Sequence, residues 1–400
     1  MHDDTSCLKS QTALGTFHSL SVPVYRASTI VFPTVDAYRN RRDAMYDGYS
    51  YGLYGTPTSR ELENRIAAIE GAARAMVLSS GFAAIVVATL ANVRTGQRVL
   101  FPDTAYDTVR PFADRFLAGL GIHVGFYDPM LGSEIAPQLT EDVALLWVES
   151  PGSVTLEVQD LPAISSAARA RGIKVAADNT YATAMRCKPL ALGVDMSICA
   201  LSKYVAGHSD VVMGSIAVND EGLFRKLKDY ARFMGQGVSA DEASLAVRGM
   251  ETMAVRLDRI ESNAGTIAVW LSGQIGVDQV RHPALPGNPG HAMWQRDFSG
   301  ATGLLTLFMA EWTRPWLADA VEALKLFAIG ASWGGTKSVI AVLDQVPMRS
   351  ATARPHDGPV LRLSIGLEHP DDLKADLVQF LATLAQHCPG AQTAAGGENS

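Results

Sequence analysis

The sequence has few cysteines, and their spacing does not bring them together. Four occur in 400 residues, and none belongs to a C-x-x-C pair or stands near a histidine at metal-ligand spacing: Cys7, Cys187, Cys199 and Cys388. The pattern therefore indicates neither a disulfide-stapled fold nor a zinc site. We expect buried or inert thiols and no bound metal.

Long apolar runs and an excess of positive charge are also missing. The chain contains no stretch of about 18 apolar residues that could span a bilayer. It begins Met-His-Asp-Asp, without the basic and apolar regions of a secretory signal. Its formal net charge of −7 argues against a phosphate-backbone ligand such as nucleic acid. We therefore expect a cytoplasmic protein with no membrane or nucleic-acid partner and with a small-molecule ligand.

The length predicts two domains, because 400 residues exceed what one hydrophobic core usually serves. We predict an N-terminal arm over 1–57, one domain over 58–240, a second over 241–388, and a disordered tail over 389–400. The arm lacks regular periodicity but contains many aromatic residues: Tyr25, Phe32, Tyr38, Tyr46, Tyr49, Tyr51 and Tyr54. Such an arm must pack on something, and the sequence leaves open its own domain and a neighbouring subunit.

From residue 58 the hydrophobic pattern becomes regular. Residues 58–61 have capping-box spacing, and apolar residues follow on one face of a helix that Gly71 can close. Residues 160–172 predict a crossover helix. Short uninterrupted apolar runs predict mainly parallel strands covered on both faces: 98–101, 143–149, 174–178, 196–202 and 211–218. The first domain is thus expected to be α/β, and the second a smaller α+β domain with a long helix through 256–262.

A lysine follows the strand predicted over 196–202. Residues 200–210 read Ala-Leu-Ser-Lys-Tyr-Val-Ala-Gly-His-Ser-Asp. Lys203 could condense with an aldehyde if its surroundings keep the amine partly neutral, although taken alone it fits a surface lysine at a strand end better. The His-Ser-Asp run does not predict a hydrolase, because three successive residues in a turn cannot align as a catalytic triad.

Other segments carry residues that suit the same chemistry. Asp178, at a strand end, could hold a pyridine nitrogen protonated. Gly81 and Phe82 begin a helix whose N-terminal N–H groups could bind an anion. Tyr106 could lay its ring on the face of a cofactor. Singly, each has an ordinary structural explanation, as a cap, a turn or a packed ring.

Taken in order, these segments resemble the Cys/Met-metabolism family of pyridoxal-5′-phosphate (PLP) enzymes, from about residue 51 to residue 368. The resemblance implies the aspartate aminotransferase fold (fold type I), with PLP as the cofactor. It implies Lys203, Tyr106 and Tyr51 as catalytic residues. The cofactor-binding residues that it implies are Lys203 as a Schiff base, Asp178 at the ring nitrogen, Tyr106 stacked on the ring, and Gly81, Phe82, Ser202 and Tyr51 at the phosphate.

Three further stretches resemble the cystathionine β-lyase branch: 149–153, 332–335 and 362–368. By this resemblance Arg362 would hold the substrate α-carboxylate through two parallel hydrogen bonds, with Ser332 and Trp333 beside it. The expected reaction cleaves L-cystathionine or a related cysteine thioether to homocysteine or another thiol, pyruvate and ammonia. γ-Replacement on an O-acylated homoserine, elimination at Cγ, a specialised cysteine-conjugate lyase and a regulatory PLP-binding protein stay open.

Two positions depart from the family pattern. Leu53 stands where an arginine would hold the PLP phosphate of a neighbouring subunit, and Ala200 stands where a hydroxyl residue often contacts it. We therefore expect weaker cofactor retention than in members that have both groups. Because Tyr51 would serve the neighbour's site, the resemblance implies a homo-oligomer, with a homotetramer built as a dimer of dimers.

Overall fold

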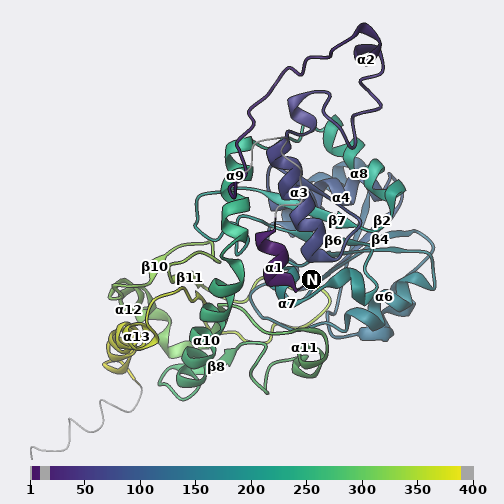
Figure 1. The fold of residues 1–400 in the computed structure, drawn as a ribbon. Coiled ribbons are helices and arrows are strands. Elements are labelled where there is room, and N and C mark those ends of the chain that lie inside the picture. Colours follow the sequence, from purple (N-terminus) through teal and green to yellow (C-terminus); the bar gives the residue numbers. More distant parts are fainter. Residues whose placement is uncertain (1, 10–18, 389–400) are drawn as a thin grey trace, which may run out of the picture.

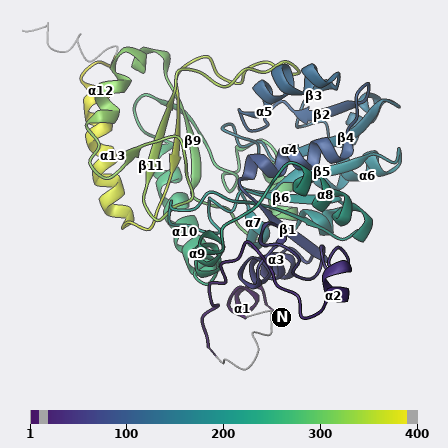
Figure 2. The ribbon, with the colours of Figure 1, turned by 90° about the horizontal axis from the view of Figure 1, so that it is seen from above.

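Two β-sheets with covering helices make up the computed structural model, which describes residues 2–9 and 19–388 (Figures 1 and 2). The larger sheet has the order β1-β7-β6-β5-β4-β2-β3. The run from β6 to β3 is parallel, and β7 is antiparallel to both of its neighbours. Its strands are β1 (Arg74–Leu78), β2 (Arg98–Pro102), β3 (His123–Tyr127), β4 (Val143–Glu149), β5 (Lys174–Asp178), β6 (Met196–Cys199) and β7 (Gly214–Val218).

Helices cover both faces of this sheet because its strands are apolar on both sides. Along β4, Leu145 and Trp147 pack with α4 (Gly81–Asn92) and α8 (Glu221–Phe233). Leu146 and Val148 point the other way and pack with α6 (Leu161–Arg169). Two-sided burial is why these strands read as continuous apolar runs. The predicted α/β fold with a mainly parallel sheet is confirmed.

Two predicted strands are shorter in the structure. The strand predicted over 196–202 ends at Cys199, because the N–H of Ala200 turns to the Thr180 hydroxyl at 2.8 Å. The strand predicted over 211–218 begins at Gly214. Both shortened ends lie next to the Lys203 turn, where side-chain bonds replace the regular strand pairing.

The first long helix, α3 (Pro57–Glu70), begins with a different cap from the predicted one. The capping box over 58–61 is wrong: Thr56 and Ser59 form the reciprocal pair, at 2.9 and 3.4 Å. The Thr58 hydroxyl instead donates to the carbonyl of Pro23, at 2.8 Å. Gly71 ends the helix in the left-handed region, with φ of 65°, as expected.

The smaller sheet has the order β10-β11-β12-β9-β8, and only β10 and β11 pair in parallel. Helices α12 (Leu317–Glu322) and α13 (Pro370–Ala385) share its core. The long helix α10 (Met253–Leu271) places Met253 in the core beside α3 and Leu271 in the core of the smaller sheet, so it joins the two (Figure 2). The predicted domain boundaries themselves stay predictions. The strands are β8 (Val277–Arg281), β9 (Leu304–Met309), β10 (Ala328–Ile329), β11 (Val339–Leu343) and β12 (Val360–Ser364).

The N-terminal arm packs partly on its own chain. Its described helical segments are α1 (Asp3–Leu8), α2 (Val35–Arg39) and η1 (Gly52–Tyr54). The Tyr46 hydroxyl donates to Asp229 at 3.0 Å, and the Arg26 guanidinium to Asp241 at 2.9 Å. Other arm residues stay exposed, among them Val31 and Val35. Figure 1 shows the α2 region extending from the body of the molecule.

The remaining helical segments complete the described chain. They are α5 (Val109–Pro111), η2 (Phe112–Leu117), η3 (Ala118–Leu120), η4 (Gly132–Gln138), α7 (Thr183–Arg186), η5 (Pro189–Leu192), α9 (Ala240–Met250), α11 (His291–Asp297) and η6 (Glu311–Trp316).

Within residues 2–9 and 19–388, no helix has the length and apolar character needed to cross a membrane. The same residues contain no His, Cys, Asp and Glu cluster suited to a metal ion. Cys7, Cys187 and Cys199 are buried, and the tail predicted over 389–400 lies outside the described residues.

A buried carboxylate ties the loop between β11 and β12 to the larger sheet. Asp103, 6% exposed, accepts the N–H groups of Ser350, Ala351 and Thr352 at 2.9 to 3.0 Å. It also forms an ion pair with Arg110. Burial tends to raise the pKa of Asp103, but the backbone donors and Arg110 together hold it below its usual value. The ionised carboxylate is therefore the form that holds this loop.

Replacing Asp103 by Asn should lower the free energy of unfolding at neutral pH by about 2 kcal/mol, because the backbone N–H groups lose a charged acceptor. The folded pKa is depressed, so this contribution is present above the unfolded value of about 3.9 and is lost as the pH falls through the folded value. Urea unfolding of both proteins at neutral and acidic pH measures this. Asp36→Asn, at an exposed carboxylate, is the control. Equal losses in both variants would contradict the interpretation.

Candidate active site

Lys203 lies in the turn after β6 and contacts a turn of the smaller-sheet region. Its Nζ donates to Ser332 Oγ at 2.7 Å and lies 5.2 Å from the centroid of the Trp333 ring. Gly334, with φ of 84°, packs on the lysine backbone, so that a Cβ there would lie 3.1 Å from the Lys203 Cα. Glycine thus permits both the left-handed backbone and the close approach of the two turns.

The surroundings of Lys203 favour the neutral form of its amine. Burial lowers the pKa of Lys203, the guanidinium of Arg362 lowers it further, and Asp178 acts in the opposite direction. Arg362, on β12, donates to the carbonyl of Ala331, the residue before Ser332. A partly buried lysine of lowered pKa meets the condition for reaction with an aldehyde.

Arg256 of α10 holds the Lys203 turn from inside the protein. Its guanidinium donates to the carbonyls of Tyr204 at 2.8 Å, Val205 at 3.3 Å and Gly249 at 2.7 Å. Burial lowers the pKa of Arg256 to about 10, which still leaves it charged at neutral pH. Sequence reasoning missed this residue, since the only signal was an arginine on the apolar face of a helix.

Three strand ends bring Tyr106, Glu149 and Asp178 together. Glu149 ends β4 and is paired in register with Asp178, which ends β5. The backbone N–H of Tyr106, in the loop after β2, donates to Glu149 Oε2 at 2.7 Å. Asp178 Oδ1 accepts the N–H of Thr180 at 3.0 Å; burial raises the pKa of Asp178, and Thr180 and Lys203 oppose that rise. Glu149 begins the stretch 149–153, which resembles the cystathionine β-lyase branch, but it was not among the predicted site residues.

The N-terminus of α4 offers backbone N–H groups beside Lys203's strand. The side chain and carbonyl of Ser80 accept the third and fourth N–H groups, at 3.0 and 3.2 Å, so those of Gly81 and Phe82 head the helix. A Cβ on Gly81 would lie 2.5 Å from the Cβ of Ala200. The Phe82 ring packs 5.5 Å from that of Phe112, which leaves its backbone to meet a ligand.

The Ser202 hydroxyl is engaged within the chain. It donates to the carbonyl of Met213 at 3.2 Å and accepts the N–H of the same residue at 2.9 Å. These bonds fix the Lys203 turn to the segment that leads into β7. Its proton would reach an anion only if the hydroxyl rotated, so its predicted contact with a phosphate stays a prediction.

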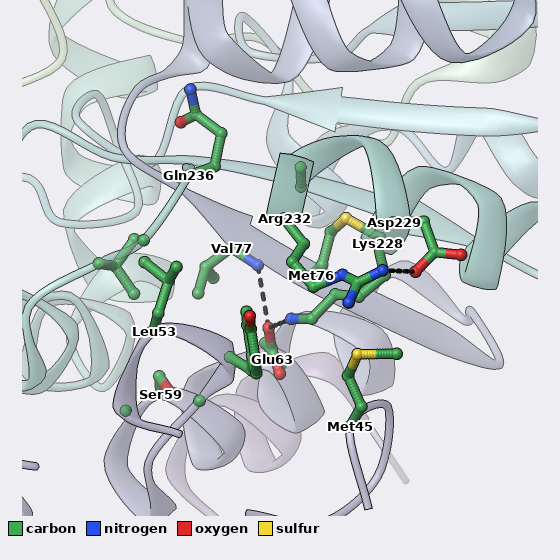
Figure 3. Close-up of a pocket in the computed structure, with 16 residues that line it drawn as sticks. Met45, Leu53, Ser59, Glu63, Met76, Val77, Lys228, Asp229, Arg232 and Gln236 are labelled. Atoms are coloured by element: carbon green, nitrogen blue, oxygen red, sulfur yellow. Dashed lines mark hydrogen bonds and ion pairs between the residues drawn. The ribbon is translucent and has the colours of Figure 1, made fainter. Parts of the chain in front are cut away.

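Tyr51 and Leu53 contact parts of the chain other than the Lys203 turn. The Tyr51 ring lies 5.9 Å from that of Tyr54 in the same arm. Leu53 lies against Gly237, where a Cβ would come within 2.5 Å of its Cδ1. Figure 3 shows Leu53 at a cavity beside α3 and α8, and that cavity is lined by none of the predicted site residues.

The two cations that line this cavity have carboxylate partners. Lys228 Nζ donates to Glu63 at 3.2 Å, and the Arg232 guanidinium donates to Asp229 at 3.2 Å (Figure 3). The cavity therefore shows no surplus positive charge that would replace the arginine missing at Leu53.

The chain is similar to proteins of known family. A family model described as Cys/Met metabolism PLP-dependent enzyme matches residues 4–382. A putative cystathionine β-lyase from Rhizobium johnstonii is 40% identical over 367 residues (91% of each chain). An L-alanine/L-glutamate racemase from Wolbachia pipientis wMel is 37% identical over 378 residues (92% of this chain, 93% of the relative). Cystathionine β-lyase MetC from Escherichia coli is 36% identical over 371 residues (90% and 93%). The crystal structure of metB from Corynebacterium glutamicum superposes with a TM-score of 0.88 at 27% identity, covering 96% and 98%.

The described residues fit the PLP of this family. Lys203 offers an amine of lowered pKa to an aldehyde, and Asp178 offers a carboxylate to a ring nitrogen. The α4 N-terminus offers N–H groups to a phosphate, and the contact between Gly81 and Ala200 leaves no room there for another Cβ.

Replacing Gly81 by Ala should weaken PLP binding by about tenfold or more, because the added Cβ would push the α4 N-terminus away from Ala200. Absorbance titration of the apoprotein with PLP measures the dissociation constant. Gly265→Ala is the matched control, since a Cβ there meets nothing within 4 Å. Unchanged affinity in the Gly81 variant would contradict the assignment of the phosphate site.

Proposed function

The chain belongs to the Cys/Met metabolism family of PLP-dependent enzymes, and we propose that it is a carbon–sulfur β-lyase. Its substrate is L-cystathionine or a related cysteine thioether, and its products are homocysteine or another thiol, pyruvate and ammonia. The observation that carries the proposal is the 2.7 Å bond from Lys203 to Ser332, which sets an amine of lowered pKa beside Arg362. Relatives named cystathionine β-lyase support it.

Arg362 binds the α-carboxylate of the substrate. Its planar guanidinium can form two parallel hydrogen bonds, and Ser332 and Trp333 border the same space. Holding the carboxylate there orients the substrate Cα toward the Lys203 amine. Tyr106, on the loop anchored to Glu149, supplies an aromatic ring to the other side of the site.

Lys203 moves the proton of the reaction. The neutral Nζ of Lys203 would take the proton from the substrate Cα. PLP, when bound, supplies the electron sink for the pair left on Cα, provided that Asp178 keeps its ring nitrogen protonated. The Cβ–S bond then breaks and the pair leaves on the thiolate, which can take the proton held on Lys203. Water hydrolyses the remaining three-carbon enamine to pyruvate and ammonia.

Lys203→Ala should abolish both cystathionine turnover and the visible absorbance of bound PLP. Lys337→Ala is the control, because Lys337 is an exposed lysine near the Ser332 turn. Thiol and pyruvate release are assayed together, so that a thiol from another source is not counted. Substantial pyruvate release by the Lys203 variant would refute the role of this residue.

A second candidate function is amino-acid racemisation, favoured by the 37% identical racemase from Wolbachia. Removal and return of the Cα proton need the same lysine and ring but no leaving thiolate. L-Alanine and L-glutamate, followed for their D-forms, distinguish it from the lyase. γ-Replacement is tested with an O-acylated homoserine and a thiol. Visible PLP absorbance without product from any of these substrates would indicate a regulatory protein.

We further propose that the protein is a homo-oligomer, a homotetramer built as a dimer of dimers, in which the arm serves a neighbouring site. The support is that Tyr51 and Leu53 are 44% and 37% exposed in the single chain although they are aromatic and apolar. The cytoplasmic location and the lack of nucleic-acid partners stay predictions of the sequence.

If Leu53 faces a neighbour's phosphate, Leu53→Arg should tighten PLP binding by about tenfold, the effect of one charge-assisted hydrogen bond. PLP titration measures the affinity, and sedimentation confirms that both proteins have the same oligomeric state. Leu53→Met keeps the site apolar and should bind as the wild type does. Equal or weaker binding by the arginine variant would count against the proposed placement of the arm.

A further inference from the structure

Two carboxyl groups lie side by side at the ends of β4 and β5. Glu149 and Asp178 are register partners on adjacent parallel strands, whose backbones run about 4.8 Å apart. A small cavity next to them is lined mainly by apolar side chains, including Phe101 and Trp147. Two carboxylates this close in apolar surroundings cannot both be charged without a large cost, so one of them tends to keep a proton.

The neighbours of the two groups differ in charge. Asp178 faces the Thr180 hydroxyl and N–H and the amine of Lys203, all of which favour its ionised form. Glu149 faces Asp178 from β5, Asp107 from the loop after β2, and the N–H groups of Tyr106 and Ser153. Arg362, the nearby guanidinium, interacts with Asp107. Lys203 therefore stands on the Asp178 side, whereas Glu149 faces the further anion Asp107.

We propose that Glu149 is a positioning residue that stays protonated at neutral pH, leaves Asp178 as the single anion of the pair, and anchors the Tyr106 loop through its uncharged carboxyl group. The pKa of Glu149 points the same way: burial raises it well above its usual value, and Asp178 raises it further. The role in positioning rests on the proposed function, because it concerns the ring that faces the PLP site. The protonation state of Glu149 does not rest on the proposed function.

Holding Tyr106 requires an acceptor but not a charge. The Tyr106 N–H reaches Glu149 Oε2 at 2.7 Å, and the carbonyl oxygen of a neutral carboxyl accepts such a bond. Glutamine has the same shape and a carbonyl oxygen but cannot ionise. Alanine removes the acceptor. The two substitutions therefore separate the anchoring of the loop from any need for a negative charge.

Infrared difference spectroscopy of the apoprotein tests the protonation directly. At pH 7, wild type minus Glu149→Gln should show the carbonyl band of a protonated carboxyl group, and in an Asp178→Asn background the band should titrate at lower pH. Glu70→Gln is the reference for a carboxyl group that titrates in this range. Burial raises the pKa of Glu70, beside Ser197, to about 7, so its carbonyl band should fade as the pH rises through that value. Carboxylate bands instead of the carbonyl band in the Glu149 difference would overturn the proposal.

PLP titration tests the anchoring. Glu149→Gln should bind PLP within about twofold of wild type, and Glu149→Ala about tenfold more weakly, as expected for loss of one buried acceptor. A glutamine variant as weak as the alanine variant, or an alanine variant as tight as wild type, would overturn the role. If the alanine variant does not fold, the infrared result and the glutamine variant still decide. Failure of wild type to bind PLP would refute the proposed function and leave the infrared result standing.

Discussion

The contact between the Lys203 turn and the Ser332 turn is the constraint on which the rest of the site depends. Lys203 belongs to the larger-sheet region, Ser332 to the smaller, and the bond between them is 2.7 Å long. Arg256 fixes the lysine turn from the α10 side through backbone carbonyls. Gly334 lets the opposing turn approach the lysine backbone. The amine is thus held between two regions that α10 joins.

The charge pattern follows from this placement. Arg362 comes from the smaller sheet and Asp178 from the larger, so the lysine lies between a cation and an anion. Burial and Arg362 outweigh Asp178 and lower the pKa of the amine. Asp103 ties the loop between β11 and β12 to the same layer that carries Tyr106. The two halves of the site therefore depend on interactions that cross between the sheets.

The strand ends could be predicted from the sequence, because continuous apolar runs identify buried parallel strands and their carboxyl ends meet at one edge. Lys203, Asp178 and Tyr106 come from such ends. The contacts of Glu149 and Arg256 could not, because each depends on a partner far away in the sequence. The cap at Thr56 was missed because Thr58 also has capping-box spacing, and the hydrogen bond from the Thr58 hydroxyl to the carbonyl of Pro23 cannot be read from the sequence. The contact of Tyr51 with a neighbouring subunit's site stays a prediction.

The most direct test of this account is to locate PLP on the chain. Borohydride reduction of the holoprotein fixes any linkage between PLP and a lysine, and peptide mass spectrometry then identifies that lysine. A single modified peptide that contains Lys203 is expected. A modification at another lysine, or none in a protein that retains PLP absorbance, would contradict it.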